Sequence, residues 1–164
     1  MFRVTNWVIG ISVTIISLSL WAYINRPQSL PEWPERVMGF SFSPYHRDQD
    51  PREQNYPSLE EIEADLALLS GKAIAVRTYS VEDNLAEIPR LARKHNLNVT
   101  LGAYLSYDEE RNAWEFPLFL EVARTNPNVV RAIVGNETQA LGLMEYDKLL
   151  EYLDQAREAL PVPV

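Results

Sequence analysis

The sequence predicts an α/β fold built on a parallel sheet, and three observations support this prediction. Strand-like and helix-like segments alternate strictly after residue 36. Such alternation is typical of parallel strands joined by right-handed helical crossovers. The chain has 164 residues, which suits one main domain. Apolar residues make up 46% of the chain, enough to bury a core.

Composition excludes several classes of function. The chain carries 23 acidic and 15 basic residues, a formal charge of −8. This charge argues against a nucleic-acid partner, because binding to phosphates depends on Lys and Arg. The chain has no cysteine, which excludes a disulfide scaffold, a thiolate metal site and a cysteine nucleophile. The sequence also lacks a histidine pair at ligand spacing, a phosphate-binding glycine loop and a Gly-x-Ser-x-Gly elbow. We therefore expect no metal and no cofactor.

The first element is an N-terminal apolar segment. No charge occurs from Trp7 to Ile24. As a helix rising ~1.5 Å per residue, these positions span about 27 Å, close to the hydrocarbon thickness of a bilayer. Trp7, Trp21 and Tyr23 lie at the two ends, where aromatic residues favour the membrane interface. We expect a transmembrane anchor over residues 1–26. A cleaved signal peptide is the alternative, disfavoured because it would end in small residues.

A spacer and a soluble domain follow the anchor. Residues 27–36 contain three prolines and are interpreted as a stiff, extended linker. Residues 37–164 form the predicted domain. Its expected strands are Val37–Phe42, Ala73–Tyr79, Asn98–Leu105 and Val129–Val134, and residues 161–164 look like the start of a fifth. Its expected helices are Ser58–Leu69, Leu85–His95, Phe116–Thr125 and Met144–Leu160. Ser58 and Glu61 form a capping-box pattern at the start of the first of these helices.

Two architectures fit this order of elements. One is an open doubly wound sheet, and the other is part of a (β/α)8 barrel. At the observed spacing of strands, eight units would need about 250 residues, which is the usual size of such a barrel. The chain would then supply the first four β/α units.

Candidate functional residues lie at the carboxyl ends of the predicted strands, where both architectures collect their sites. These ends carry aromatic rings, hydroxyls, an amide and a carboxylate. Aromatic faces stack on sugar rings, and amides and acids bond to sugar hydroxyls, so the set suits a carbohydrate. The candidate substrate-binding residues are Asn136, Tyr79, Tyr45, Arg77 and Tyr104. Arg77 is expected to contact either a barrel carboxylate or the substrate.

Glu137 is the candidate catalytic residue. It follows a fully apolar strand end, and we expect its carboxyl to lie in low-dielectric surroundings. Burial raises the pKa of a carboxyl group, as a general acid near neutral pH requires. Asn136 beside it could orient a sugar through a hydroxyl. The competing interpretation is that Gly135 to Thr138 forms an ordinary turn in which Asn136 has a positive φ.

Four strand-end motifs resemble glycoside hydrolase family 17, the β-1,3-glucanase-like enzymes, in its bacterial, membrane-linked branch. They are Val134-Gly135-Asn136-Glu137, Val76-Arg77-Thr78-Tyr79, Met38-Gly39-Phe40-Ser41-Phe42-Ser43-Pro44-Tyr45 and Leu101-Gly102-Ala103-Tyr104-Leu105. The similarity runs from Val37 to Val164. It implies a TIM barrel of the (β/α)8 type. It also implies that Glu137 is the general acid/base, that Asn136 orients the substrate and that Tyr79 lies beside the cleavage subsite.

The same resemblance implies a missing group. A retaining glycosidase needs a second carboxylate, about 5–5.5 Å from the first, as nucleophile. In family 17 this residue lies at the end of strand seven, whereas this chain stops near the start of strand five. We therefore expect the N-terminal half of a catalytic barrel, inactive alone. The strand-end loop acids Asp48, Asp50, Glu82 and Asp108 are disfavoured as replacements, because solvated acids are common in loops.

Three functions remain open at this stage. The first is a membrane-anchored retaining β-glucan hydrolase or transglycosylase acting on β-1,3-glucan. The second is a non-catalytic glucan-binding or accessory module, with a polysaccharide synthase as a candidate partner. The third is an open receiver-sized α/β domain, disfavoured because no acidic pair follows the first strand. For the first two we expect a single-pass protein of the bacterial inner membrane, with the soluble part periplasmic or extracytoplasmic.

Overall fold

The computed structural model describes residues 2–30, 32 and 34–164. The chain divides into two compact units, residues 1–33 and residues 34–164. Each unit is described by itself. The predicted boundaries at residues 26 and 36 stay predictions.

The first unit contains one long apolar helix, α1 (Phe2–Ile24). Its segment Arg3–Ile24 has a mean hydropathy of 1.9, and none of it is buried. The Thr14 hydroxyl donates a hydrogen bond to the Gly10 carbonyl oxygen at 3.0 Å, which satisfies a polar group within the helix. The helix is long and apolar enough to cross a membrane, and an N-terminal signal sequence has the same features.

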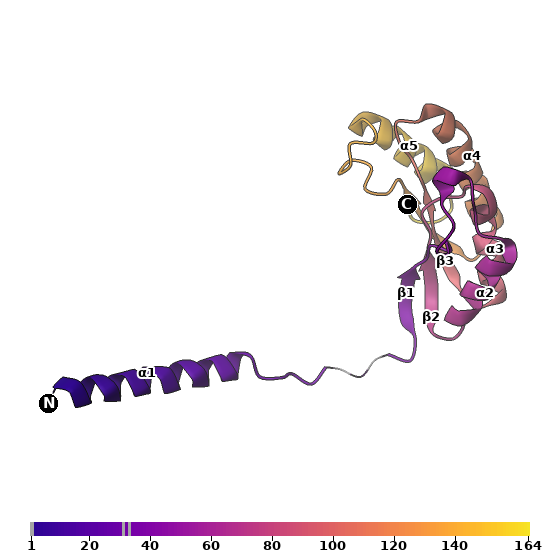
Figure 1. Cartoon of the computed structure of the whole chain (residues 1–164). Helices are drawn as coiled ribbons and strands as arrows, with labels where there is room; N and C mark the ends of the chain where they lie inside the picture. Colours follow the sequence, from indigo (N-terminus) through magenta and orange to yellow (C-terminus); the bar gives the residue numbers. More distant parts are fainter. Residues whose placement is uncertain (1, 31, 33) are drawn as a thin grey trace. The chain divides into compact units, whose positions relative to one another are not determined.

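The second unit alternates strands and helices (Figure 1). The strands are β1 (Val37–Ser41), β2 (Ala73–Arg77), β3 (Asn98–Ala103) and β4 (Val129–Val134). The α-helices are α2 (Leu59–Leu69), α3 (Ile88–Lys94), α4 (Glu109–Thr125) and α5 (Tyr146–Ala159). Two short 3-10 helices, η1 (Pro51–Glu53) and η2 (Asp83–Glu87), lie in the loops after β1 and β2.

Strand order distinguishes the two predicted architectures. The four strands pair in parallel in the sequential order β1-β2-β3-β4. A doubly wound sheet reverses its strand order at a switch point, and this sheet has no reversal. With right-handed crossovers throughout, a sequential order places every helix on the same face, as in a TIM barrel. The predicted barrel-type fold with four β/α units is therefore confirmed.

The two faces of the sheet differ in polarity. Val76, Val99 and Val129 are register partners across β2, β3 and β4, and all three are buried. Because neighbouring residues of a strand point to opposite faces, the row around Thr100 faces the other way. That row joins Arg77 on β2 to Thr100, and Thr100 to the exposed Arg131 on β4. The β3–β4 register shifts between Val99 and Thr100, which pairs Arg131 with Thr100. The apolar core thus lies on the face of the three valines, and Arg77, Thr100 and Arg131 place polar side chains on the other face.

Three of the predicted element boundaries can be compared directly with the structure. The capping box predicted at the start of α2 is present, because the Ser58 and Glu61 side chains each accept a hydrogen bond from the other's backbone N–H. The predicted start of α4 at Phe116 was wrong. That helix begins at Glu109 and carries Pro117 in its interior, where proline normally favours a helix start. Residues 161–164 form no regular strand, but the Pro163 carbonyl accepts a hydrogen bond from the Ala132 amide of β4.

Candidate active site

A pocket of about 330 Å³ opens at the carboxyl ends of β1, β2 and β3. Three of the predicted substrate-binding residues line it: Tyr45, Tyr79 and Tyr104. They come from loops that follow three different strands, and each is partly buried. The structure therefore brings these tyrosines together around one concave, largely apolar site.

Tyr45 is held in this pocket by its aromatic and charged surroundings. Its ring centre lies 6.4 Å from that of Tyr56, with the planes tilted by 51°. Burial, and then the negative charge of Glu82, raise the pKa of Tyr45 to about 12. The phenol is thus neutral at physiological pH, and its O–H can act as both a hydrogen-bond donor and an acceptor.

Arg77 connects the pocket to the end of β4. Its guanidinium Nη2 donates a hydrogen bond to the Asn136 side-chain oxygen at 2.8 Å. The guanidinium carbon also lies 4.9 Å from the centre of the Tyr79 ring, a cation–π contact. Arg77, Tyr79 and Asn136 therefore form one contact chain. In the described residues the protein partner of Arg77 is an amide rather than the barrel carboxylate considered from the sequence.

Residues 135–138 form a tight turn after β4. Gly135 has a φ of 77° and Glu137 has a φ of 52°, whereas Asn136 is not among the residues with positive φ. A side chain at Gly135 would place its Cβ 2.4 Å from the Thr138 hydroxyl oxygen, so the turn requires glycine there. The Glu137 carbonyl accepts a hydrogen bond from the Leu141 amide at 2.9 Å, and Thr138 is buried. The alternative interpretation was correct that this segment is a turn and wrong that Asn136 is its left-handed residue.

Glu137 itself is exposed. The described residues therefore do not supply the low-dielectric environment expected for its carboxyl. The apolar strand β4 ends before this residue, and the left-handed turn carries Glu137 away from the core. Its assignment as the general acid/base stays a prediction, and so do the substrate-binding assignments.

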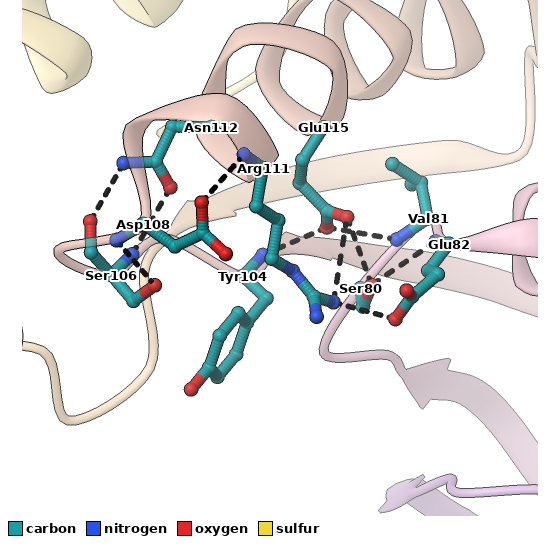
Figure 2. Close-up of polar contacts among 9 residues, drawn as sticks. All are labelled: Ser80, Val81, Glu82, Tyr104, Ser106, Asp108, Arg111, Asn112 and Glu115. Atoms are coloured by element: carbon teal, nitrogen blue, oxygen red, sulfur yellow. Dashed lines mark hydrogen bonds and ion pairs between the residues drawn. The ribbon is translucent and has the colours of Figure 1, made fainter. Parts of the chain in front are cut away.

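Sequence reasoning missed Glu115, a buried carboxylate on α4 that contacts the residues following β2 and β3 (Figure 2). Its side chain is fully inaccessible to solvent. The carboxylate accepts hydrogen bonds from the Val81 amide at 3.0 Å, the Tyr104 amide at 2.9 Å and the Ser80 hydroxyl at 3.1 Å. Burial raises the pKa of Glu115, and these hydrogen bonds partly oppose that rise.

Arg111, one turn before Glu115 on α4, was also missed. Its guanidinium lies 2.6 Å from a carboxylate oxygen of Glu82 and 3.9 Å from one of Glu115. It also stacks over Tyr104 and Trp114, with centroid distances of 4.7 and 5.7 Å. Both residues were missed because residues 109–115 were expected to be loop. The available signal was their i, i+4 spacing after Asp108, a good N-cap residue.

Three of the four loop acids weighed as a second carboxylate make other contacts. Asp50 pairs with Arg52, whose hydrogen bonds lower its pKa to about 2. Glu82 pairs with Arg111, and Asp108 caps α4 by accepting from the Arg111 amide at 3.0 Å. Among the described residues, no group of three or more histidines and carboxylates could hold a metal ion.

Comparisons with known proteins place this domain in a family. A β-1,3-glucanosyltransferase from Rhizomucor miehei, solved as an active-site mutant with laminaritriose, is similar in structure with a TM-score of 0.61. At 20% sequence identity this similarity covers 74% of this chain and 44% of that one. The likeness supports the fold, and the chain spans less than half of that neighbour. A search of curated proteins finds no match. The family model of the BtgE/BtgC glycoside hydrolase domain matches residues 39–163, and the chain belongs to this family.

Proposed function

We propose that the protein acts on β-1,3-glucan as a retaining hydrolase or transglycosylase of the family 17 type. The observation that carries this proposal is the arrangement of the strand ends in a glycoside hydrolase domain. A pocket lined by tyrosines follows β1 to β3, and the Asn136–Glu137 pair follows β4. The hydrogen bond from Arg77 to Asn136 joins the two parts. The laminaritriose bound to the structural neighbour is the reason for choosing a β-1,3-linked glucan.

In this proposal the pocket binds the sugar rings of the glucan. Tyr45, Tyr79 and Tyr104 offer aromatic surface for the apolar faces of sugar rings. Glu82 and Arg111 line the same pocket and offer acceptors and donors to sugar hydroxyls. A mostly apolar cavity with a few fixed polar groups is the usual form of a small-ligand site.

In this proposal Glu137 acts as the general acid and then as the general base. It would protonate the oxygen of the leaving sugar and then deprotonate either water or the hydroxyl of an acceptor sugar. This carboxyl is exposed, and a bound glucan covering the turn would exclude water from it. Because Asp50, Glu82 and Asp108 are engaged in other contacts, we propose a nucleophile from another strand of the barrel.

The test replaces Glu137 in a protein that joins these residues to the barrel strand carrying the proposed nucleophile. Glu137→Gln keeps the size of the side chain and removes its acid function, so release and transfer of sugar from laminari-oligosaccharides should fall by about 10²–10⁴-fold. Glu145→Gln, an exposed acid of the same loop, is the matched control and should leave turnover unchanged. Products are measured by chromatography. Retained turnover in the Glu137 variant would remove this residue from the acid/base role.

A non-catalytic glucan-binding module is the second candidate. It is favoured by a pocket complete without Glu137 and by the exposure of that carboxyl. This candidate predicts that laminaritriose binds, that no product forms even in the protein with the proposed nucleophile strand, and that Glu137→Gln leaves the affinity unchanged. In either case a polysaccharide synthase stays a proposed partner.

We further propose that α1 anchors the protein in the inner membrane of a bacterium, with residues 34–164 extracytoplasmic. Its apolar length and its exposed side chains support an anchor. Fractionation of cells followed by N-terminal sequencing tests this proposal. An intact N-terminus that resists extraction at alkaline pH is expected. A soluble protein cleaved near residue 24 would identify a signal sequence instead.

A further inference from the structure

Glu115 has no part in the chemistry proposed above, yet its surroundings are highly organised. A buried carboxylate is costly unless its oxygens are paired, and Glu115 satisfies both oxygens. One of them, Oε1, accepts from the amides of Val81 and Tyr104. Val81 follows β2 and Tyr104 follows β3. A single oxygen atom therefore joins the ends of two neighbouring strands, at the base of two pocket-lining loops.

The second oxygen, Oε2, faces Arg111 and the Ser80 hydroxyl. Arg111 is held from the other side by Glu82, whose carboxylate lies 2.6 Å away. Because two carboxylates fix it, the guanidinium has a defined position over Tyr104. Figure 2 shows Arg111 lying between Glu82 and Tyr104, with Glu115 behind it on α4.

The Tyr104 ring thus depends on α4 in two ways. Its backbone amide is held by Glu115, and its ring is contacted by Arg111. A planar guanidinium can stack on an aromatic ring and bond to carboxylates in its own plane, whereas a lysine ammonium cannot do both. The identity of residue 111 therefore affects the aromatic wall of the pocket as well as the local charge.

We propose that Glu115 and Arg111 are positioning residues that preset Tyr104 for stacking on a glucan ring. Glu115 fixes the backbone at the ends of β2 and β3, and Arg111 braces the ring. This inference rests on the proposed function only for the identity of the ligand. The bracing of Tyr104 is a property of the free protein and can be measured without any sugar.

The test compares Arg111→Lys with Arg111→Met in the full chain in detergent micelles. Lysine keeps the positive charge next to Glu82 and Glu115 and loses the planar stack. The binding constant for laminaritriose is measured by calorimetry, and the mobility of the Tyr104 ring by NMR of ¹³C-labelled tyrosine. Arg90→Lys is the control, because Arg90 also pairs with a glutamate, Glu87, and neither of these residues lines the pocket.

We expect Arg111→Lys to melt close to the wild type, to free the Tyr104 ring and to bind laminaritriose about tenfold more weakly. Arg111→Met should lower the melting temperature as well, because two carboxylates lose their cation. If Arg111→Lys leaves ring mobility and affinity unchanged, Arg111 only balances charge and the inference is wrong. The wild type could fail to bind laminaritriose while the Tyr104 ring becomes mobile in the lysine variant. That result would support the positioning of Tyr104 by Arg111 and reject laminaritriose as the ligand.

Discussion

The pocket after β1 to β3 and the turn after β4 are built in opposite ways. The pocket rests on a fully buried carboxylate, Glu115, which accepts hydrogen bonds from two neighbouring loops. The turn presents Glu137 to solvent on a left-handed backbone. One region is organised by side-chain contacts and the other by backbone conformation.

This difference indicates how binding and chemistry are divided. Preset aromatic and polar groups favour binding, because little order has to be acquired when a ligand arrives. Glu137 lies in solvent, so its proposed acid role depends on what covers it. Arg77, through its contacts with Tyr79 and Asn136, is a direct side-chain link between the two regions.

The largest expected difference between the two regions is in the free energy of unfolding when Glu115 or Glu137 is replaced by alanine. Glu115→Ala leaves the Val81 and Tyr104 amides without their acceptor and opens a cavity, so the free energy of unfolding should fall by about 3–5 kcal/mol. Glu137→Ala removes an exposed side chain and should change it by less than about 0.5 kcal/mol. Urea unfolding of the full chain, followed by near-ultraviolet circular dichroism, measures both. Equal losses would show that the two regions are not distinct in this way.

The stability of the turn after β4 should instead depend on its backbone conformation at Gly135. Gly135→Ala places a Cβ in a left-handed conformation and 2.4 Å from the Thr138 hydroxyl oxygen, which should cost about 1–3 kcal/mol. Gly142→Ala is the matched control. Gly142 also has a positive φ, 62°, but a Cβ there would meet nothing within 4 Å. The difference between the two variants in urea unfolding isolates the contact with Thr138, and equal costs would show that only φ matters.

Much of the fold could be predicted from the sequence, because helix caps and apolar strands are local signals. The capping box of α2 and the limits of β4 are examples. The start of α4 was missed because residues 109–115 have few apolar side chains. The tyrosines of the pocket were found because strand ends converge in any parallel barrel. The role of Glu115 could not be found, since its partners are backbone amides brought close only by the packing of α4 on the sheet.

The smallest expected effect is a pH dependence that belongs to Glu115 alone. Burial raises its pKa in the folded state, so the folded protein holds this proton more tightly than the unfolded chain does. Stability from this group is therefore greatest when the carboxyl is protonated. It declines as pH rises from the ordinary carboxyl pKa through the raised folded value. Arg111 and Glu82 are the charged groups around it.

Glu115→Gln removes this titration, and its amide oxygen can still accept from the Val81 and Tyr104 amides. The wild type should therefore lose stability relative to the glutamine variant as pH rises from about 4.5 towards neutrality. Exposed acids with lowered pKa values, such as Asp50, Glu63 and Glu109, act in the opposite direction at lower pH and cancel between the two proteins. Urea midpoints at a series of pH values measure the difference. A gap that stays constant with pH would show that hydrogen bonds and Arg111 offset the burial of Glu115 completely.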